Sequence, residues 1–208
     1  MIATMVQFAD LLADIQSQMK REVRCEFTPA LSARICDAAL VEALITGLPM
    51  AQGVKHRIIR SRGRGVILTA KVHYREGVRM LRGKDLSKDE TDALATARAI
   101  AEAFSHTDEE TRFSQVYEWI CRHICYTHTA PGQKGYERLV GASGVIQDGQ
   151  ANCQGFADVM YLLCGLCGIA CTYRSGRGEK QLHVWNAVCI DGQWRDVDAS
   201  KGARAQKS

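Results

Sequence analysis

The sequence predicts an α+β protein in which a cysteine-bearing helix packs on an antiparallel β-sheet, preceded by a small α+β lobe. Three observations support this fold class. A strongly apolar stretch with helical spacing follows Asn152 and extends to about Gly168. Strand-like stretches then follow, and the last two are joined at Asp191-Gly192, a typical hairpin turn. The N-terminal third mixes helical and strand patterns, as an accessory lobe would.

Residues 1–86 are expected to form this lobe. Apolar residues recur with helical spacing in two stretches and with partial alternation in the others. We expect two helices, one strand and one hairpin, at Phe8–Lys20, Ile35–Ile45, Glu22–Phe27 and Ile58–Tyr74. The hairpin carries a basic cluster, Arg57, Arg60, Arg62 and Arg64. Solvated hairpin residues are the favoured interpretation of this cluster, and a polyanion site is the alternative.

Residues 87–208 are expected to form the second domain. Ser87 and Glu90 have capping-box spacing, so a long helix should begin there, with a second helix over Glu109–Cys125. After the cysteine-bearing helix, three strands are expected, with a polar loop at Ser175–Lys180 between the first two. The strands are Ile169–Arg174, Leu182–Ile190 and Gln193–Asp198.

Composition limits the function classes. The chain has 208 residues, 46% of them hydrophobic and 24% charged, with a net charge of +4. This charge is too small and too evenly spread to predict a nucleic-acid or membrane partner. No apolar run of membrane-spanning length and no signal peptide are visible, so we expect a cytoplasmic location, with secretion open if the natural chain starts earlier. Nine cysteines at irregular spacing indicate reduced thiols.

Cys153 is the candidate nucleophile. Asn152 is a good N-cap, which places Cys153 in the first turn of the helix. The positive end of the helix dipole favours a thiolate there, and the free amides of the same turn can hold an oxyanion. A buried structural thiol is the alternative, since the chain uses cysteines freely.

His183 and an aspartate complete the predicted set. His183 lies on one predicted strand, and both Asp196 and Asp198 lie on the next, so adjacent strands would bring an imidazole and a carboxylate together. The two aspartates are two residues apart and would face the same side of a strand. Asn152, Gln154 and Trp185 are the candidate oxyanion-binding and substrate-binding residues, and Trp185 could equally belong to the core.

These residues resemble the transglutaminase-like superfamily of papain-like cysteine enzymes, especially its small bacterial members. The resemblance covers roughly residues 109–200. It rests on residues 148–157, Gly168-Ile169, the block His183-Val184-Trp185-Asn186, and Trp194 followed by Asp198. The polar, basic tail after Asp198 departs from the family, in which an aromatic residue usually follows the aspartate.

The resemblance implies a role for each residue. Cys153 would be the nucleophile, His183 the general base and acid, and Asp198 the residue that orients the imidazole. The position relative to Trp194 favours Asp198 over Asp196. The resemblance also implies a papain-like α+β core and no metal or other cofactor.

Covalent acyl transfer on amide bonds is the resulting hypothesis, with a protein or peptide as substrate. Hydrolysis is favoured because a crosslinking transferase must exclude water from its acyl-enzyme. Crosslinking through glutamine and a catalytically idle peptide-binding module are the alternatives. A metal site is disfavoured because the spacings within two clusters suit zinc poorly; these are Cys121, His123, Cys125 and His128, and Cys164, Cys167 and Cys171.

Overall fold

The computed structural model describes residues 1–61, 64–104, 107–177 and 182–205. The chain divides into two compact units, Met1–Tyr74 and Arg75–Ser208. The domain boundary predicted at residue 86 stays a prediction, while the division into compact units falls earlier along the chain. Within the described residues, no helix combines the length and apolar character needed to cross a membrane.

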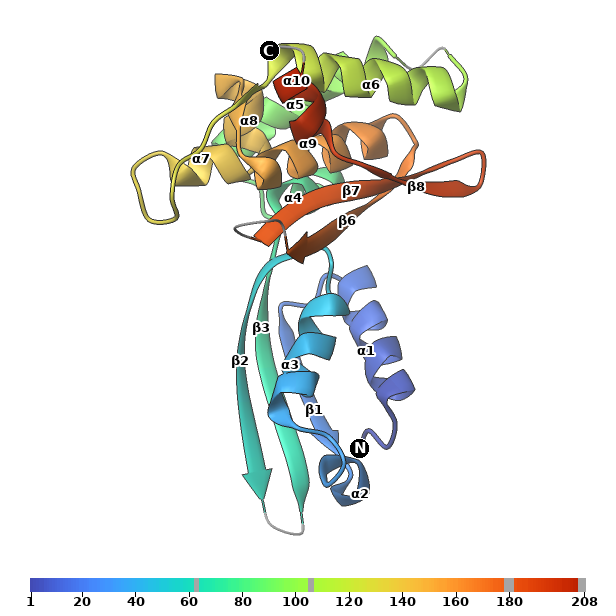
Figure 1. Cartoon of the computed structure of the whole chain (residues 1–208), viewed down its shortest axis with the longest axis vertical. Helices are drawn as coiled ribbons and strands as arrows, with labels where there is room; N and C mark the ends of the chain where they lie inside the picture. Colours follow the sequence, from blue (N-terminus) through green and yellow to red (C-terminus); the bar gives the residue numbers. More distant parts are fainter. Residues whose placement is uncertain (62–63, 105–106, 178–181, 206–208) are drawn as a thin grey trace. The chain divides into compact units, whose positions relative to one another are not determined.

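The first unit is a three-stranded antiparallel sheet with helices on one face (Figure 1). Its strand order is β1-β3-β2. The bounds are α1 (Met5–Ser17), β1 (Glu22–Phe27), α2 (Pro29–Ser32), α3 (Asp37–Thr46), β2 (Ala51–Ser61) and β3 (Gly65–Tyr74). The predicted strand Glu22–Phe27 is confirmed, and the predicted hairpin is present with a first arm that begins earlier, at Ala51.

The core of the first unit lies between the sheet and α1 and α3. Strand β1 alternates exposed and buried residues, so one side of each strand faces the helices. Phe8 of α1 meets Phe27 of β1 edge to face, with 5.1 Å between ring centroids. Arg60, one of the four clustered arginines, donates to Asp37 and to the Ser32 and Ile35 carbonyls, so it fastens the hairpin to the α2–α3 segment. Arg62 lies outside the described residues.

The second unit is built around a helix, α9, that is apolar on nearly every side. Figure 1 shows α9 between a three-stranded sheet and the helices α5 and α6, and it contacts all of them. The bounds are α4 (Glu76–Arg82), α5 (Lys88–Glu102), α6 (Glu109–His123), β4 (Cys125–Tyr126), α7 (Tyr136–Val140), α8 (Ala142–Asp148), β5 (Gln150–Ala151), α9 (Cys153–Leu166), β6 (Ala170–Arg177), β7 (Leu182–Ile190), β8 (Gln193–Val197) and α10 (Ala199–Ala205).

Local signals correctly predicted several of these elements. The capping box of Ser87 and Glu90 is formed in both directions at the start of α5. Asp191 and Gly192 both have positive φ, as a tight turn between twisted antiparallel strands requires, and β7 pairs with β8 across it. The sheet order is β6-β7-β8, all antiparallel.

Other elements differ from the sequence prediction. Helices α4, α7, α8 and α10 were not predicted, and α10 occupies the polar tail. Strand β6 extends to Arg177 into the predicted loop, whose residues 178–180 lie outside the described part of the chain.

A buried carboxylate, Asp158, fastens α9 to its surroundings. Its Oδ2 accepts hydrogen bonds from the backbone N–H groups of Gly77 and Ala142, each at 2.9 Å, and Tyr173 donates to its Oδ1 at 2.7 Å. Burial raises the pKa of Asp158, although Arg75, Tyr173 and the two amides act against this rise. One side chain therefore joins α4, α8, α9 and β6.

We predict that Asp158→Ala lowers the free energy of unfolding by about 3 kcal/mol, because two buried amides lose their acceptor. Asp158→Asn should cost less, since its amide oxygen can still accept from both backbone groups while the Tyr173 hydroxyl turns to accept from its nitrogen. Urea denaturation of both variants measures this. Equal losses for the two variants would contradict the proposed bonding.

Candidate active site

Cys153 is the first residue of α9, and its side chain is buried. The Asn152 Oδ1 caps the helix by accepting from the backbone N–H groups of Gln154 at 2.9 Å and Gly155 at 3.3 Å. These two amides are therefore occupied. Among the described residues, no acceptor engages the backbone N–H of Cys153, so this amide is the donor that remains for an oxyanion beside the thiol.

His183 and Asp198 form the second part of the site. The His183 Nε2 and the Asp198 Oδ2 lie 2.7 Å apart, and the two side chains are 22% and 15% exposed. This bond occupies Nε2 and leaves Nδ1 as the imidazole nitrogen that can exchange a proton with a thiol. The remaining oxygen of Asp198, Oδ1, accepts from the Ser200 backbone N–H at 3.1 Å and from its hydroxyl at 2.7 Å, which fixes the carboxylate.

The structure separates the two candidate aspartates. Strand β8 ends at Val197, so Asp198 lies beyond the strand and just before α10, and the expected shared face does not exist. Asp196 remains on β8, is 65% exposed, and lies 3.9 Å from Arg174. Of the two aspartates, only Asp198 forms a hydrogen bond with His183.

Chain topology brings the start of α9 to the same end of the unit as the His183–Asp198 pair. The short turn after α9 reverses the chain into β6, and β7 is antiparallel to β6, so β7 runs in the same direction as α9. Asn186 of β7 donates to the Ala157 carbonyl of α9 at 3.1 Å and holds the two elements together. Cys153 and His183 therefore begin neighbouring elements, and antiparallel β8 returns to the same end.

Tyr126 and Arg204 lie near the candidate site, although no local pattern in the sequence predicts this. Strand β4 pairs with β5 so that Tyr126 lies opposite Ala151, just before Cys153. The Arg204 guanidinium lies 3.6 Å from the centre of the Tyr126 ring. Burial raises the pKa of Tyr126, Arg204 lowers it, and the charges of Cys153 and Asp198 raise it further, so Tyr126 lies within electrostatic reach of both groups.

The predicted substrate-binding residues have defined surroundings. The Trp185 ring stacks on the His183 ring, with centroids 5.8 Å apart and planes 20° apart. Trp185 also lies against Gly176 of β6, where an added Cβ would approach the indole to 3.0 Å. Gln154 donates from its side chain to the Tyr136 hydroxyl at 3.1 Å. Trp185 thus covers one side of the imidazole, and Gln154 is held toward α7.

Two cysteines of the clusters considered as zinc sites are buried beside groups that are not metal ligands in this arrangement. Cys121 is buried with its Sγ 3.7 Å from the Ala199 carbonyl, and Cys164 is buried with its Sγ 3.5 Å from the Met160 sulfur. Within the described ranges, no three His, Cys, Asp or Glu side chains are gathered as metal ligands would be.

A model of the transglutaminase-like superfamily matches residues 90–199 of this chain, and the chain therefore belongs to that superfamily. This family has the α+β fold that the sequence predicted. The N-terminal unit lies outside the matched residues.

Kyphoscoliosis peptidase of Homo sapiens is 31% identical over 112 residues, and that of Mus musculus is 30% identical over 112 residues. Each match covers 48% of this chain but only 16% of the relative. Among solved structures, a TGase has a TM-score of 0.46 at 14% identity and covers 86% of this chain and 50% of its own. The periplasmic domain of TgpA from Pseudomonas aeruginosa has a TM-score of 0.45 at 13% identity, covering 76% and 69%.

Asp198 should make stability depend on pH in a defined direction. Burial alone would raise the pKa of Asp198, but hydrogen bonds from Ser200 and His183 and the charges of His183 and Lys201 outweigh burial, so the pKa is lowered. A carboxylate with a lowered pKa stabilises the fold above its ordinary pKa of about 3.9. That stabilisation is lost as the pH falls through the lowered value.

We predict that Asp198→Asn melts at a lower temperature than the wild type at neutral pH, and that this gap closes as the solution is acidified below about pH 4. Asp196→Asn is the matched control, because Asp196 is exposed, and it should show almost no gap at any pH. Thermal melting across the pH range measures both. A gap for Asp198→Asn that does not change with pH would contradict the assigned contacts.

Proposed function

We propose that this chain is a cysteine-dependent acyl-transfer enzyme that hydrolyses amide bonds of a protein or peptide substrate. The observation that carries the proposal is the His183–Asp198 hydrogen bond at the end of the unit where α9 begins with Cys153. A carboxylate that holds one imidazole nitrogen leaves the other for the nucleophile, which is the recurrent arrangement of covalent acyl transfer.

The reaction has two steps. The Cys153 sulfur, after giving its proton to His183, bonds to the amide carbonyl carbon, and the Cys153 backbone N–H donates to the resulting oxyanion. His183 then gives the proton to the departing amine as the C–N bond breaks, which leaves a thioester on Cys153. His183 takes a proton from a water molecule that attacks this thioester, the C–S bond breaks, and the proton returns to the sulfur.

Two features support hydrolysis over crosslinking. The side chains of His183 and Trp185 are both partly exposed, so water can reach the imidazole that would activate it. The relatives at about 30% identity carry the name peptidase. A protein-glutamine crosslinking activity would instead need an amine acceptor to outcompete water at the thioester.

Acyl-enzyme formation tests the proposal. We expect the intact mass of the wild type, mixed with glutamine-containing peptides, to rise by the mass of an acyl group, because Cys153 becomes a thioester. Cys153→Ala should gain no mass while keeping its melting temperature. Without an added amine, the released product should be the hydrolysed acid.

Product analysis separates the alternatives. If the released product carries the added amine in preference to water, the enzyme is a crosslinking transferase. If a panel of glutamine-containing and unrelated peptides yields neither adduct nor cleaved product with the folded wild type, catalysis is ruled out for those substrates in favour of an idle peptide-binding module. An equal mass gain in Cys153→Ala would overturn the assignment of the nucleophile.

A further inference from the structure

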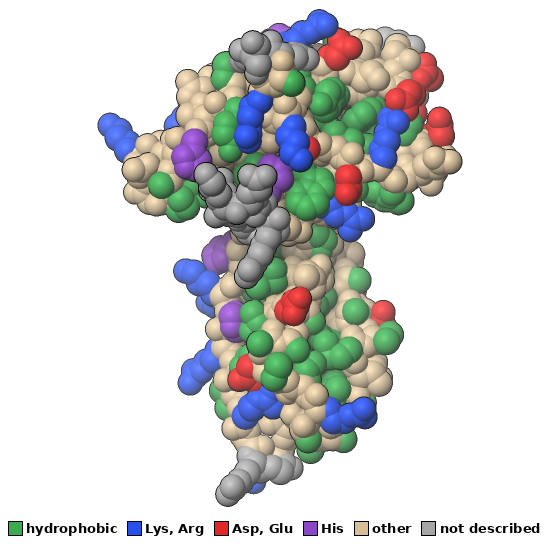
Figure 2. All heavy atoms as spheres, in the orientation of Figure 1, with side chains coloured by type: hydrophobic (Ala, Val, Ile, Leu, Met, Phe, Trp, Pro, Cys, Tyr) green, Lys and Arg blue, Asp and Glu red, His purple; other side chains and the backbone are tan. Residues whose placement is uncertain are grey.

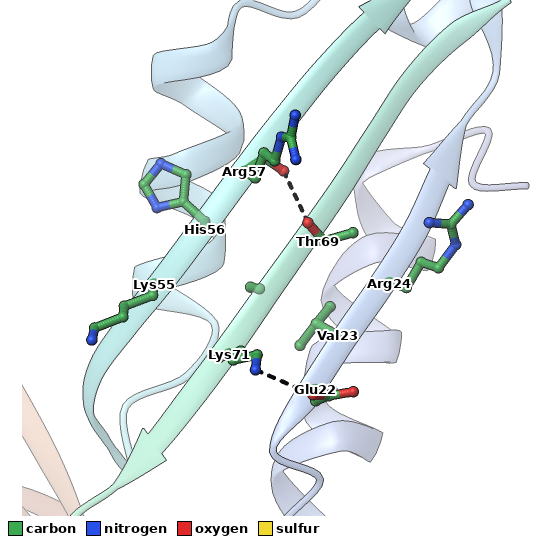
Figure 3. Close-up of a pocket in the computed structure, with 9 residues that line it drawn as sticks. Glu22, Val23, Arg24, Lys55, His56, Arg57, Thr69 and Lys71 are labelled. Carbon is green, nitrogen blue, oxygen red and sulfur yellow. Dashed lines mark hydrogen bonds and ion pairs between the residues drawn. The ribbon is translucent and has the colours of Figure 1, made fainter.

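The sheet of the first unit has one face that its helices do not cover, and this face is basic. Figure 3 shows Arg24 of β1, Lys71 and Thr69 of β3, and Lys55 and Arg57 of β2 across neighbouring strands. With Glu22 and adjacent residues they line an open hollow of about 400 Å³. We call Arg24, Lys55, Arg57 and Lys71 the basic face.

Two of these four cations have no acidic partner among the described residues. Lys71 pairs with Glu22 at 3.7 Å, and Arg24 pairs with Glu26 at 3.1 Å, in both cases between exposed side chains. Lys55 and Arg57 lie two apart on β2 and form no ion pair within the described part of the chain. Strand β2 forms one border of the first unit in Figure 1. Figure 2, in the same orientation, shows Lys, Arg and His side chains along that border.

Strand β2 is also an open edge. Among the described strands it pairs with β3 alone, through residues 51–61. Successive residues of a strand direct their backbone N–H and C=O groups to opposite sides. The Val72 N–H donates to the Arg21 carbonyl on the β1 side, so the N–H and C=O groups of Lys71 point to β2, where Lys71 is paired with Lys55. By the same alternation, the N–H and C=O groups of Val54, His56 and Ile58 point away from the sheet, and they have no hydrogen-bond partner among the described residues.

We propose that β2 binds an extended peptide segment with acidic side chains at alternate positions, which adds to the sheet as a further strand. The outward backbone groups of Val54, His56 and Ile58 supply the hydrogen bonds. Alternate residues of a strand share one face and repeat about every 6.6 Å, which is also the spacing of Lys55 and Arg57. Two acidic residues of the segment therefore lie beside two unpaired cations.

Charge and chemistry favour this occupant over two others. Pairing of β2 with the β2 of a second copy would place Lys55 and Arg57 of each chain beside those of the other, which like-charge repulsion disfavours. Single-stranded nucleic acid is bound by stacking its bases on aromatic rings. The described outward residues of the three strands include no Phe, Tyr or Trp, and Glu22 and Glu26 interrupt the cations.

Binding of a fluorescent ten-residue peptide of alternating Glu and Val tests the proposal, with an alternating Lys and Val peptide as its counterpart. By fluorescence anisotropy, the full chain should bind the acidic peptide at least about tenfold more tightly than the basic one. Hydrogen exchange should show new protection of the β2 amides when the acidic peptide is added, because His56 and Ile58 then donate to it.

Three variants separate a specific site from general attraction to a basic protein. Lys55→Glu/Arg57→Glu should bind the acidic peptide about tenfold more weakly. The control Lys84→Glu/Arg98→Glu replaces two exposed cations of the second unit and alters the net charge by the same amount. It should bind within about twofold of the wild type. His56→Pro should weaken binding without a change of charge, because it removes an outward N–H and keeps the ladder with β3.

Several outcomes would overturn the proposal. One is equal weakening by the two double variants with melting temperatures unchanged, and another is no preference for the acidic peptide. A third is an oligonucleotide that binds more tightly than the peptide and displaces it, which would identify the face as a nucleic-acid site. None of these readouts depends on Cys153, so the result is independent of the proposed catalysis.

Discussion

The hydrogen bond between His183 and Asp198 is the interaction on which the catalytic account depends. It joins the start of β7 to the segment after β8, and it determines which imidazole nitrogen is free. Ser200 holds the other carboxylate oxygen, so the orientation of the ring is set by α10 as well as by the sheet. Because the Asn152 side chain accepts from the Gln154 and Gly155 amides, the backbone N–H of Cys153 is the first-turn amide that this cap leaves open beside the thiol.

Features with local causes were predictable from the sequence. The cap at Asn152, the capping box at Ser87 and the turn at Asp191-Gly192 each depend on residues within four positions of one another. The start of α8 could not be predicted in this way, because Glu76 and Asp158, both distant in sequence, accept from its first amides. Helix α10 likewise depends on burial of Ala199 and Ala203 in the core of the second unit.

The candidate site was predictable to the level of residue types and less so in its details. The residues alone did not decide between Asp196 and Asp198 as the partner of His183, and the family resemblance favoured Asp198. The end of β8 at Val197 gives the physical reason, because it places Asp198 beyond the strand while Asp196 stays on it. Tyr126 and Arg204 carried no local signal, because the pairing of β4 with β5 brings Tyr126 opposite Ala151, and the packing of α10 brings Arg204 onto the Tyr126 ring. In the first unit, the periodic pattern predicted the hairpin. It did not predict which backbone groups of β2 point away from the sheet, because that follows from the register with β3.

The most direct test of whether His183 activates the Cys153 thiol is the rate at which iodoacetamide alkylates each cysteine. Mass spectrometry of the digested protein gives this rate for each cysteine-containing peptide. We expect Cys153, although buried, to react faster at neutral pH than the exposed Cys36 and Cys125, and we expect His183→Ala to remove this advantage. The same rate for Cys153 as for the exposed cysteines, or an unchanged rate in His183→Ala, would contradict a thiol activated by the His183 imidazole.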